Sequence, residues 1–199
     1  MNYFLERFQA LYPVVKRGLD ILVSGAALLL LAPLLLVLCL LVRLTSKGPA
    51  LFWSERTGFK GKPFMMPKLR TMTQCSKVMS RESADDTDIS LTPIGFVLRK
   101  SSLDELPQLW CVLKGEMSLI GPRPLLVNDR AAAQRRARPE IYNVKPGITG
   151  LAQVNGRNFI SMRNKVRFDA FYADRVCLFL DAKILYRTVG TVFNFKLVQ

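Results

Sequence analysis

The sequence ILVSGAALLLLAPLLLVLCLLV, from Ile21 to Val42, is an apolar run without a charged residue. As a helix rising about 1.5 Å per residue, its roughly 22 residues would extend about 33 Å, enough to cross the hydrocarbon core of a bilayer. The run is too long for a signal peptide and lacks a small-residue cleavage site at its end. The apolar run therefore predicts a membrane-bound protein, and the other segments are placed relative to this membrane segment.

Pro33 lies in the middle of this run, where a proline removes a helix hydrogen bond and bends the chain. Basic residues flank the run on both sides, namely Lys16, Arg17, Arg43 and Lys47. Because basic flanks favour the cytoplasmic side, a hairpin-like helix bent at Pro33 satisfies that rule at both ends. A kinked transmembrane helix would break the rule at one end. The residues alone leave both shapes open, and either one attaches the protein to a membrane.

Charge and composition narrow the class of partner. The chain has 199 residues, 29 of them basic and 15 acidic, which gives a net charge of +14. Its partners are therefore expected to be anionic: nucleic acid, phospholipid or phosphorylated substrates. There is no histidine, and the four cysteines are scattered, so a structural zinc site is not expected. A bound metal should be a hard ion held by oxygen ligands.

The chain divides into three predicted segments: an amphipathic interfacial segment (1–15), a membrane helix broken near Pro33 (16–46) and a polar domain (47–199). In the polar domain we expect strands at Leu51–Trp53 and Phe64–Met72, a helix over Ser102–Leu113, and one or two amphipathic helices between Lys165 and Leu197. The predicted fold class is α+β, mainly helical with short strands and with amphipathic helices at the membrane interface.

The stretch RKSSLDELPQLW, from Arg99 to Trp110, holds the candidate chemistry. One interpretation is a capping box, in which Ser102 and Glu105 satisfy each other's backbone N–H groups at a helix start. That interpretation leaves Asp104 without a task beyond complementing the helix dipole. In the other interpretation, phosphates gather at the helix start, one carboxylate attacks a phosphorus atom, and its neighbour holds a divalent ion.

Basic residues in three further motifs are candidate phosphate ligands. Lys68 lies in the second predicted strand, and Arg123 lies between Pro122 and Pro124, which fix its backbone. Asn155-Gly156 predicts a hairpin turn, with Arg157 directly after it. A basic helix predicted from Ala131 to Arg138 would rest on anionic headgroups or face water.

These motifs, taken in order, resemble the bacterial sugar transferases, also called monotopic phosphoglycosyl transferases. The resemblance runs from Lys16-Arg17 to about Thr191 and includes the proline-broken membrane helix. It rests on the fragments KLRTM (68–72), LRKSSLDELPQL (98–109), LKGEMS (113–118), GPRPLL (121–126), VKPGITG (144–150) and AQVNGRN (152–158). A departure is Ala32, where the family usually has a serine before the proline of the bend.

The resemblance implies a two-step reaction. Asp104 would attack the sugar-bearing phosphate of a UDP-sugar, expel UMP and carry the phosphosugar, which undecaprenyl phosphate would then accept. Glu105 would hold Mg²⁺. Lys68, Arg99 and Arg123 occupy positions expected to contact phosphate or nucleotide, with Arg157 a further substrate-binding candidate, and the sugar would be an N-acetylated amino sugar. The membrane helix would be re-entrant, anchored by Lys16 and Arg17 and bent at Pro33.

The same resemblance implies a place in the cell and a set of partners. The protein would sit in the bacterial inner membrane among phospholipids, with its catalytic domain on the cytoplasmic face, and would bind no nucleic acid. It would catalyse the first membrane step of glycoconjugate or polysaccharide assembly, as a monomer or an oligomer. Two alternatives stay open: a membrane-anchored module that binds polyanions, and a non-catalytic scaffold.

Overall fold

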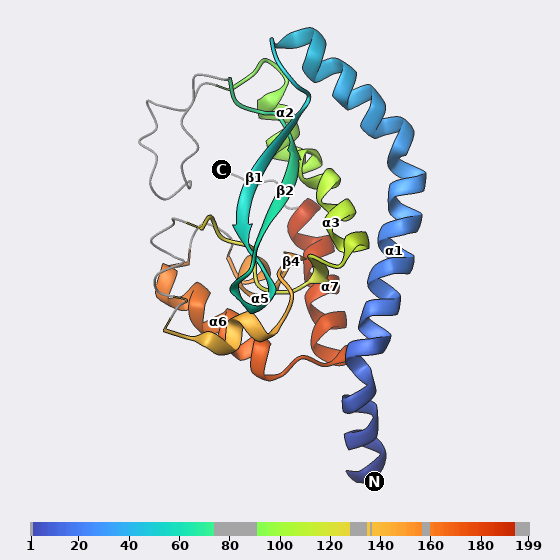
Figure 1. The fold of residues 1–199 in the computed structure, drawn as a ribbon, viewed down its shortest axis with the longest axis vertical. Helices are drawn as coiled ribbons and strands as arrows, with labels where there is room; N and C mark the ends of the chain where they lie inside the picture. The colour runs from blue at the N-terminus through green and yellow to red at the C-terminus, as the bar shows by residue number, and fades with distance from the viewer. Residues whose placement is uncertain (1, 74–90, 128–134, 136, 157–159, 194–199) are drawn as a thin grey trace.

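The computed structural model describes residues 2–73, 91–127, 135, 137–156 and 160–193, and it confirms an α+β fold (Figure 1). The α-helices are α1 (Asn2–Thr45), α2 (Gly95–Ser101), α3 (Leu109–Lys114), α5 (Leu151–Val154), α6 (Met162–Asp174) and α7 (Leu178–Phe193). The 3-10 helices are η1 (Phe59–Gly61), η3 (Leu103–Gln108) and η4 (Pro139–Asn143). The strands are β1 (Leu51–Thr57), β2 (Pro63–Leu69), β3 (Ser118–Ile120) and β4 (Gly147–Thr149).

Helix α1 is the longest element and contains the predicted apolar run. It continues through both Pro13 and Pro33, and it curves along one side of the domain with its first turns extending beyond it (Figure 1). The predicted interfacial segment and the predicted membrane segment therefore belong to one curved helix and not to two separate ones. A re-entrant path through a bilayer stays a prediction.

The outer face of α1 is apolar and uncovered by the domain. Leu29 and Leu30 expose 81% and 78% of their surface, which is unfavourable in water. Within the part of the chain that the structure describes, this is the one helix long and apolar enough to cross a membrane. The inner face packs on the domain, where Leu38 and Val42 join Leu69 and Leu98 in a buried cluster.

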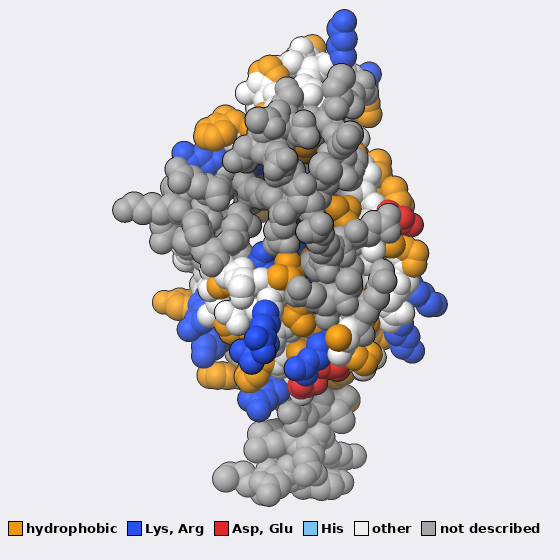
Figure 2. Space-filling model, turned by 90° about the vertical axis from the view of Figure 1, so that its left-hand side faces the viewer, with side chains coloured by type: hydrophobic (Ala, Val, Ile, Leu, Met, Phe, Trp, Pro, Cys, Tyr) orange, Lys and Arg blue, Asp and Glu red, His pale blue; other side chains and the backbone are white. Residues whose placement is uncertain are grey.

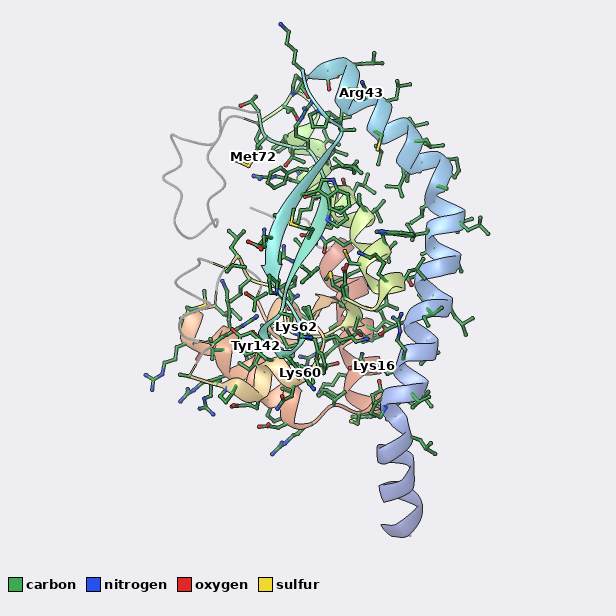
Figure 3. All side chains as sticks on the ribbon, in the orientation of Figure 1. Lys16, Arg43, Lys60, Lys62, Met72 and Tyr142 are labelled. Atoms are coloured by element: carbon green, nitrogen blue, oxygen red, sulfur yellow. The ribbon has the colours of Figure 1, made fainter. Side chains whose placement is uncertain are left out.

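Two acidic residues tie the rest of the molecule to α1. Asp20 accepts hydrogen bonds from Ser118 Oγ (3.1 Å) and from the backbone N–H of Leu119 (2.9 Å). Asp181 of α7 accepts from Tyr12, from Lys16 Nζ (2.6 Å) and from Tyr172 (2.7 Å). The lower part of α1, where Lys16 lies, is thus fastened to both β3 and α7 (Figure 3).

The described residues form two sheets of two strands each. Strands β1 and β2 pair antiparallel, with Leu51 opposite Leu69 and Thr57 opposite Pro63, and η1 lies in the turn between them. Lys60 and Lys62 lie at this turn, near Tyr142 (Figure 3). The first strand extends beyond its predicted end at Trp53, whereas the second ends at Leu69, short of Met72.

Strands β3 and β4 pair parallel, with Ser118 opposite Gly147 and Ile120 opposite Thr149. A Cβ atom on Gly147 would lie 2.0 Å from the backbone nitrogen of Gly121, so this pairing requires a glycine there. The pairing fixes the loop that follows β3, which carries Arg123.

Two predictions for the C-terminal half have different outcomes. The stretch predicted to form one or two helices contains two, α6 and α7. The hairpin predicted at Asn155-Gly156 is wrong, because Asn155 ends helix α5 and its side chain donates to the carbonyl of Leu151 (2.7 Å). Gly156 supplies a positive φ (141°) directly after that helix. An Asn-Gly pair therefore ends a helix here: Asn155 keeps a negative φ (-101°), and only Gly156 uses the positive-φ backbone that favours glycine.

Candidate active site

The Asp104–Glu105 pair lies in η3, and its orientation depends on an unusual residue before it. Ser102 has a left-handed backbone (φ 58°, ψ 17°), ends α2 and begins η3. Its side chain makes no cap hydrogen bond, and the Glu105 N–H donates to the Ser102 backbone carbonyl (3.2 Å). The capping box is therefore wrong. Ser102 turns the chain between α2 and η3, and the side chain of Glu105 binds Lys68 and Arg123 and not the Ser102 N–H. A non-glycine residue in this conformation costs about 1–3 kcal/mol, which the surrounding packing must offset.

The single helix predicted over Ser102–Leu113 is divided as well. Residues up to Gln108 form the 3-10 helix η3, and α3 begins at Leu109. Pro107 has no N–H to donate into a helix ladder, which explains why regular α-helix starts only after it. The candidate residues consequently precede the α-helix and face strand β2.

Glu105 holds two cations on one oxygen. Its Oε1 accepts from Lys68 Nζ (2.7 Å) and from Arg123 Nη2 (2.6 Å), which come from β2 and from the loop after β3. Burial alone would raise the pKa of Glu105, but Arg123 and Lys68 hold it well below its usual range. Glu105 is therefore a carboxylate that stays ionised and fixes both cations.

Asp104 differs from Glu105 in its hydrogen bonding. Its side chain is buried, with 8% of the residue exposed, and within the described residues no group donates a hydrogen bond to it. Burial and then the neighbouring Glu105 charge raise its pKa, while Lys68 and Arg99 oppose that shift. A carboxylate without hydrogen bonds in a water-poor site keeps its lone pairs available for attack.

Three predicted cations surround this pair. Arg99 lies in the last turn of α2 and donates from Nε to Thr71 Oγ1 (3.0 Å). Burial lowers the pKa of Lys68, an effect that the Glu105 charge opposes. The Arg123 side chain keeps 46% of its surface exposed, so it can reach a ligand in solution. The structure thus brings Lys68, Arg99 and Arg123 to Asp104 from three different segments; Arg157 lies outside the described residues.

The predicted magnesium ion can be tested against the donors present. Mg²⁺ is usually held by one or two carboxylates together with substrate phosphates. Asp104 and Glu105 supply such a pair, and both cations bind Oε1 of Glu105. No group of three or more acidic or cysteine side chains suited to a metal occurs in the described parts of the chain. The pair therefore fits an Mg²⁺ ion that binds together with a substrate diphosphate. It does not form a metal site with a complete set of protein ligands.

The predicted anchor residues contact protein groups. Lys16 binds Asp181, and Arg17 donates to the carbonyls of Val112 (2.6 Å) and Leu113 (2.7 Å) at the end of α3. A cation there complements the negative end of that helix. The role of these residues in anchoring the membrane helix stays a prediction.

Basic side chains are also abundant on the domain surface away from α1. That face shows Lys and Arg side chains among apolar ones, with few acidic side chains in view (Figure 2). The excess of positive charge predicted from the composition is thus displayed where anionic partners could approach.

Comparisons with known proteins identify relatives over nearly the whole chain. The family model described as bacterial sugar transferase matches residues 11–195. The uncharacterised sugar transferase EpsL of Bacillus subtilis is 42% identical over 94% of this chain and 91% of its own length. The UDP-glucose:undecaprenyl-phosphate glucose-1-phosphate transferase of Klebsiella pneumoniae is 41% identical over 88% of this chain.

A third relative, from Aeromonas hydrophila, is named for transfer of a different sugar. This UDP-N-acetylgalactosamine-undecaprenyl-phosphate N-acetylgalactosaminephosphotransferase is 38% identical over 92% of the chain. The chain spans 39% of the length of the Klebsiella relative and 45% of the Aeromonas relative. It therefore corresponds to one part of those longer proteins and to nearly all of EpsL.

Proposed function

The chain belongs to the bacterial sugar transferase family, and from that premise we propose that it transfers a sugar-1-phosphate from a UDP-sugar to undecaprenyl phosphate. The printed names of the Klebsiella and Aeromonas relatives support this pair of substrates. The observation that carries the proposal is the site itself. Asp104 is buried and accepts no hydrogen bond from the described residues, and beside it Glu105 binds two cations.

In the first step, a carboxylate oxygen of Asp104 attacks the phosphorus that carries the sugar. A new Asp104–phosphorus ester bond forms, the phosphorus–oxygen bond to the rest of the diphosphate breaks, and UMP leaves with that electron pair. Attack requires the ionised form of Asp104, which Lys68 and Arg99 favour. This step divides one difficult displacement into two easier ones.

In the second step, a phosphate oxygen of undecaprenyl phosphate attacks the same phosphorus. The bond to Asp104 breaks, the carboxylate is regenerated, and undecaprenyl diphosphate-sugar leaves. The acceptor is a lipid, and α1 would keep the domain at the surface where that lipid is presented.

The cations supply electrostatic stabilisation. Lys68 and Arg123 are held in place by Glu105 before substrate binds, so they need little reorganisation when charge develops on the phosphate oxygens. Arg99 lies near enough to Asp104 for its charge to oppose the rise in the Asp104 pKa. Mg²⁺, held by Glu105 with Asp104 beside it, would neutralise diphosphate charge when bound.

We also propose an inner-membrane location with the domain on the cytoplasmic face, where UDP-sugars are made. An N-acetylated amino sugar is the proposed substrate, in keeping with the Aeromonas relative, whereas the Klebsiella relative is named for glucose. The product would enter glycoconjugate or polysaccharide assembly.

The test is a substrate panel. Purified protein is given undecaprenyl phosphate, Mg²⁺ and one UDP-sugar at a time, and UMP release is measured. The proposal expects UMP from UDP-N-acetylhexosamines, with repeated turnover only when undecaprenyl phosphate is present. If every UDP-sugar, UDP-glucose included, gives no UMP, the proposed activity is wrong.

A further inference from the structure

A buried arginine lies behind the site, in a position that the proposed reaction does not use. Arg135 is 6% exposed, and Asp169 of α6 is 1% exposed. Arg135 Nη2 donates to the Asp169 carboxylate, and its Nη1 donates to the backbone carbonyl of Arg123 (2.7 Å). One planar guanidinium therefore connects α6 to the loop that carries Arg123.

Arg123 continues this line of contacts into the site through its bond to Glu105. The loop is also held through its neighbours, since the Gly147 N–H donates to the Pro122 carbonyl and the Thr57 N–H to the Leu125 carbonyl (both 2.9 Å). Arg135 donates to the carbonyl of Arg123, which lies between Pro122 and Leu125. A shift of the Arg123 carbonyl would also move the Cα atom of Arg123, and with it the side chain that donates to Glu105.

We propose that Arg135, oriented by Asp169, is a positioning residue that fixes the Arg123 backbone and thereby the Arg123–Glu105 contact beside Asp104. The inference rests on the proposed function, because it assigns Arg135 a role in that reaction. A buried ion pair is by itself weak evidence for stability, since desolvation offsets much of its attraction. The second hydrogen bond, to the Arg123 carbonyl, gives this pair its connection to the site.

The main variant is Arg135→Lys. A lysine keeps a positive charge beside Asp169, but it lacks the planar fork that bonds Asp169 and the carbonyl together. We expect the rate of UMP release in the first turnover to fall about tenfold or more, because small displacements of a positioned group cost large factors in rate. Tyr12→Phe is the matched control: it removes one buried hydrogen bond at α1, and its rate should stay near wild type.

A double-mutant cycle separates positioning from general stabilisation. If Arg135 acts through Arg123, the effect of Arg135→Lys on the rate should largely disappear in an Arg123→Lys background. A full multiplicative effect in that background would overturn the inference, as would an unchanged rate in the single Arg135→Lys variant.

Amide hydrogen exchange keeps this inference separate from the proposed activity. Arg135→Lys should increase exchange at the Gly147 N–H, which is bonded to the loop, while Tyr12→Phe should not. If wild type releases no UMP, the proposed function fails, and the exchange result alone then decides whether Arg135 holds the loop. Unchanged exchange at Gly147 would contradict it in either case.

Discussion

Asp104 is a buried carboxylate whose proposed reactivity and whose cost to the stability of the fold have the same origin. Without hydrogen-bond donors among the described residues, its charge is stabilised only by nearby cations and opposed by Glu105. An Asp with a folded-state pKa above its unfolded value favours the folded state at low pH, and that contribution is lost as pH rises through the folded pKa. At neutral pH the ionised Asp104 therefore lowers the free energy of unfolding.

Asp104→Asn should separate these two properties. The variant keeps the shape of the side chain but removes the charge and the nucleophile. We expect UMP release to fall by at least about a thousandfold, as for removal of other catalytic nucleophiles. Thermal unfolding at neutral pH should occur at or above the wild-type temperature. A clear drop in unfolding temperature would contradict the electrostatic account of this residue.

The pH dependence of the first step follows from the same two carboxylates. UMP release should fall as the pH drops through the raised pKa of Asp104, above the value near 4 that is usual for Asp. The depressed pKa of Glu105 means that its contribution to stability is present above its unfolded pKa and is lost only as pH falls through its lower folded value. Stopped-flow UMP release and circular dichroism over the same pH series should therefore show activity lost before folding.

Glu105→Gln tests the charge that gathers Lys68 and Arg123. Hydrogen bonds to a charged group contribute about 1.5–3 kcal/mol each, so UMP release should fall roughly a hundredfold. The Lys68 pKa, already lowered by burial, should fall further once Glu105 is neutral. Glu140→Gln is the control, because Glu140 pairs only with an exposed arginine, and its rate should stay within about twofold.

At the scale of elements, Asp181 is one of the residues that connect α1 to the domain. Its carboxylate accepts from Tyr12, Lys16 and Tyr172, and only 4% of the residue is exposed. Removing one partner of a buried pair leaves the other uncompensated.

We expect Asp181→Asn to lower the free energy of unfolding by about 3 kcal/mol, measured by denaturation in detergent micelles. Asp174→Asn changes an exposed residue of α6 and should alter it by no more than about 0.5 kcal/mol. Equal stability of both variants would show that α1 is held to the domain by other contacts.

The elements also show how far sequence reasoning reaches. The apolar run, the strands β1 and β2 and the C-terminal helices were predictable because each carries a local signal of period or length. The capping box failed because its residues match a common local pattern, whereas Ser102 has a left-handed backbone and Glu105 accepts hydrogen bonds from Lys68 of β2 and from Arg123 of the loop after β3.

The site was predictable in its residues more than in its contacts. Lys68, Arg99 and Arg123 were expected to bind phosphate, and they meet beside Asp104. That Glu105 joins two of them depends on partners distant in sequence. Arg135 was expected to face water or lipid within a basic helix, yet it is buried against Asp169, whose position 34 residues later gives no local signal.

At the scale of the whole molecule, the path of α1 through the membrane decides which sides its two ends occupy. Lys16 and Arg43 lie toward opposite ends of the described helix (Figure 3), and both of its flanks are basic. A re-entrant helix places both ends on one side of the membrane, in agreement with the positive-inside rule.

Single cysteines can distinguish the two paths. In a background with the four native cysteines replaced by alanine, Asn2→Cys and Lys47→Cys are labelled with an impermeant maleimide in sealed inverted vesicles. Lys183→Cys, exposed on α7, reports the side of the domain. We expect all three to react equally. Protection of Asn2→Cys alone would show that α1 spans the bilayer.

The most direct test of the account is the mass of the protein after exposure to its UDP-sugar and Mg²⁺ with the lipid acceptor withheld. The account predicts one added sugar-phosphate on Asp104, release of one equivalent of UMP, and loss of the adduct when undecaprenyl phosphate is supplied. Turnover at the native rate without any adduct on Asp104, or native turnover by Asp104→Asn, would contradict it.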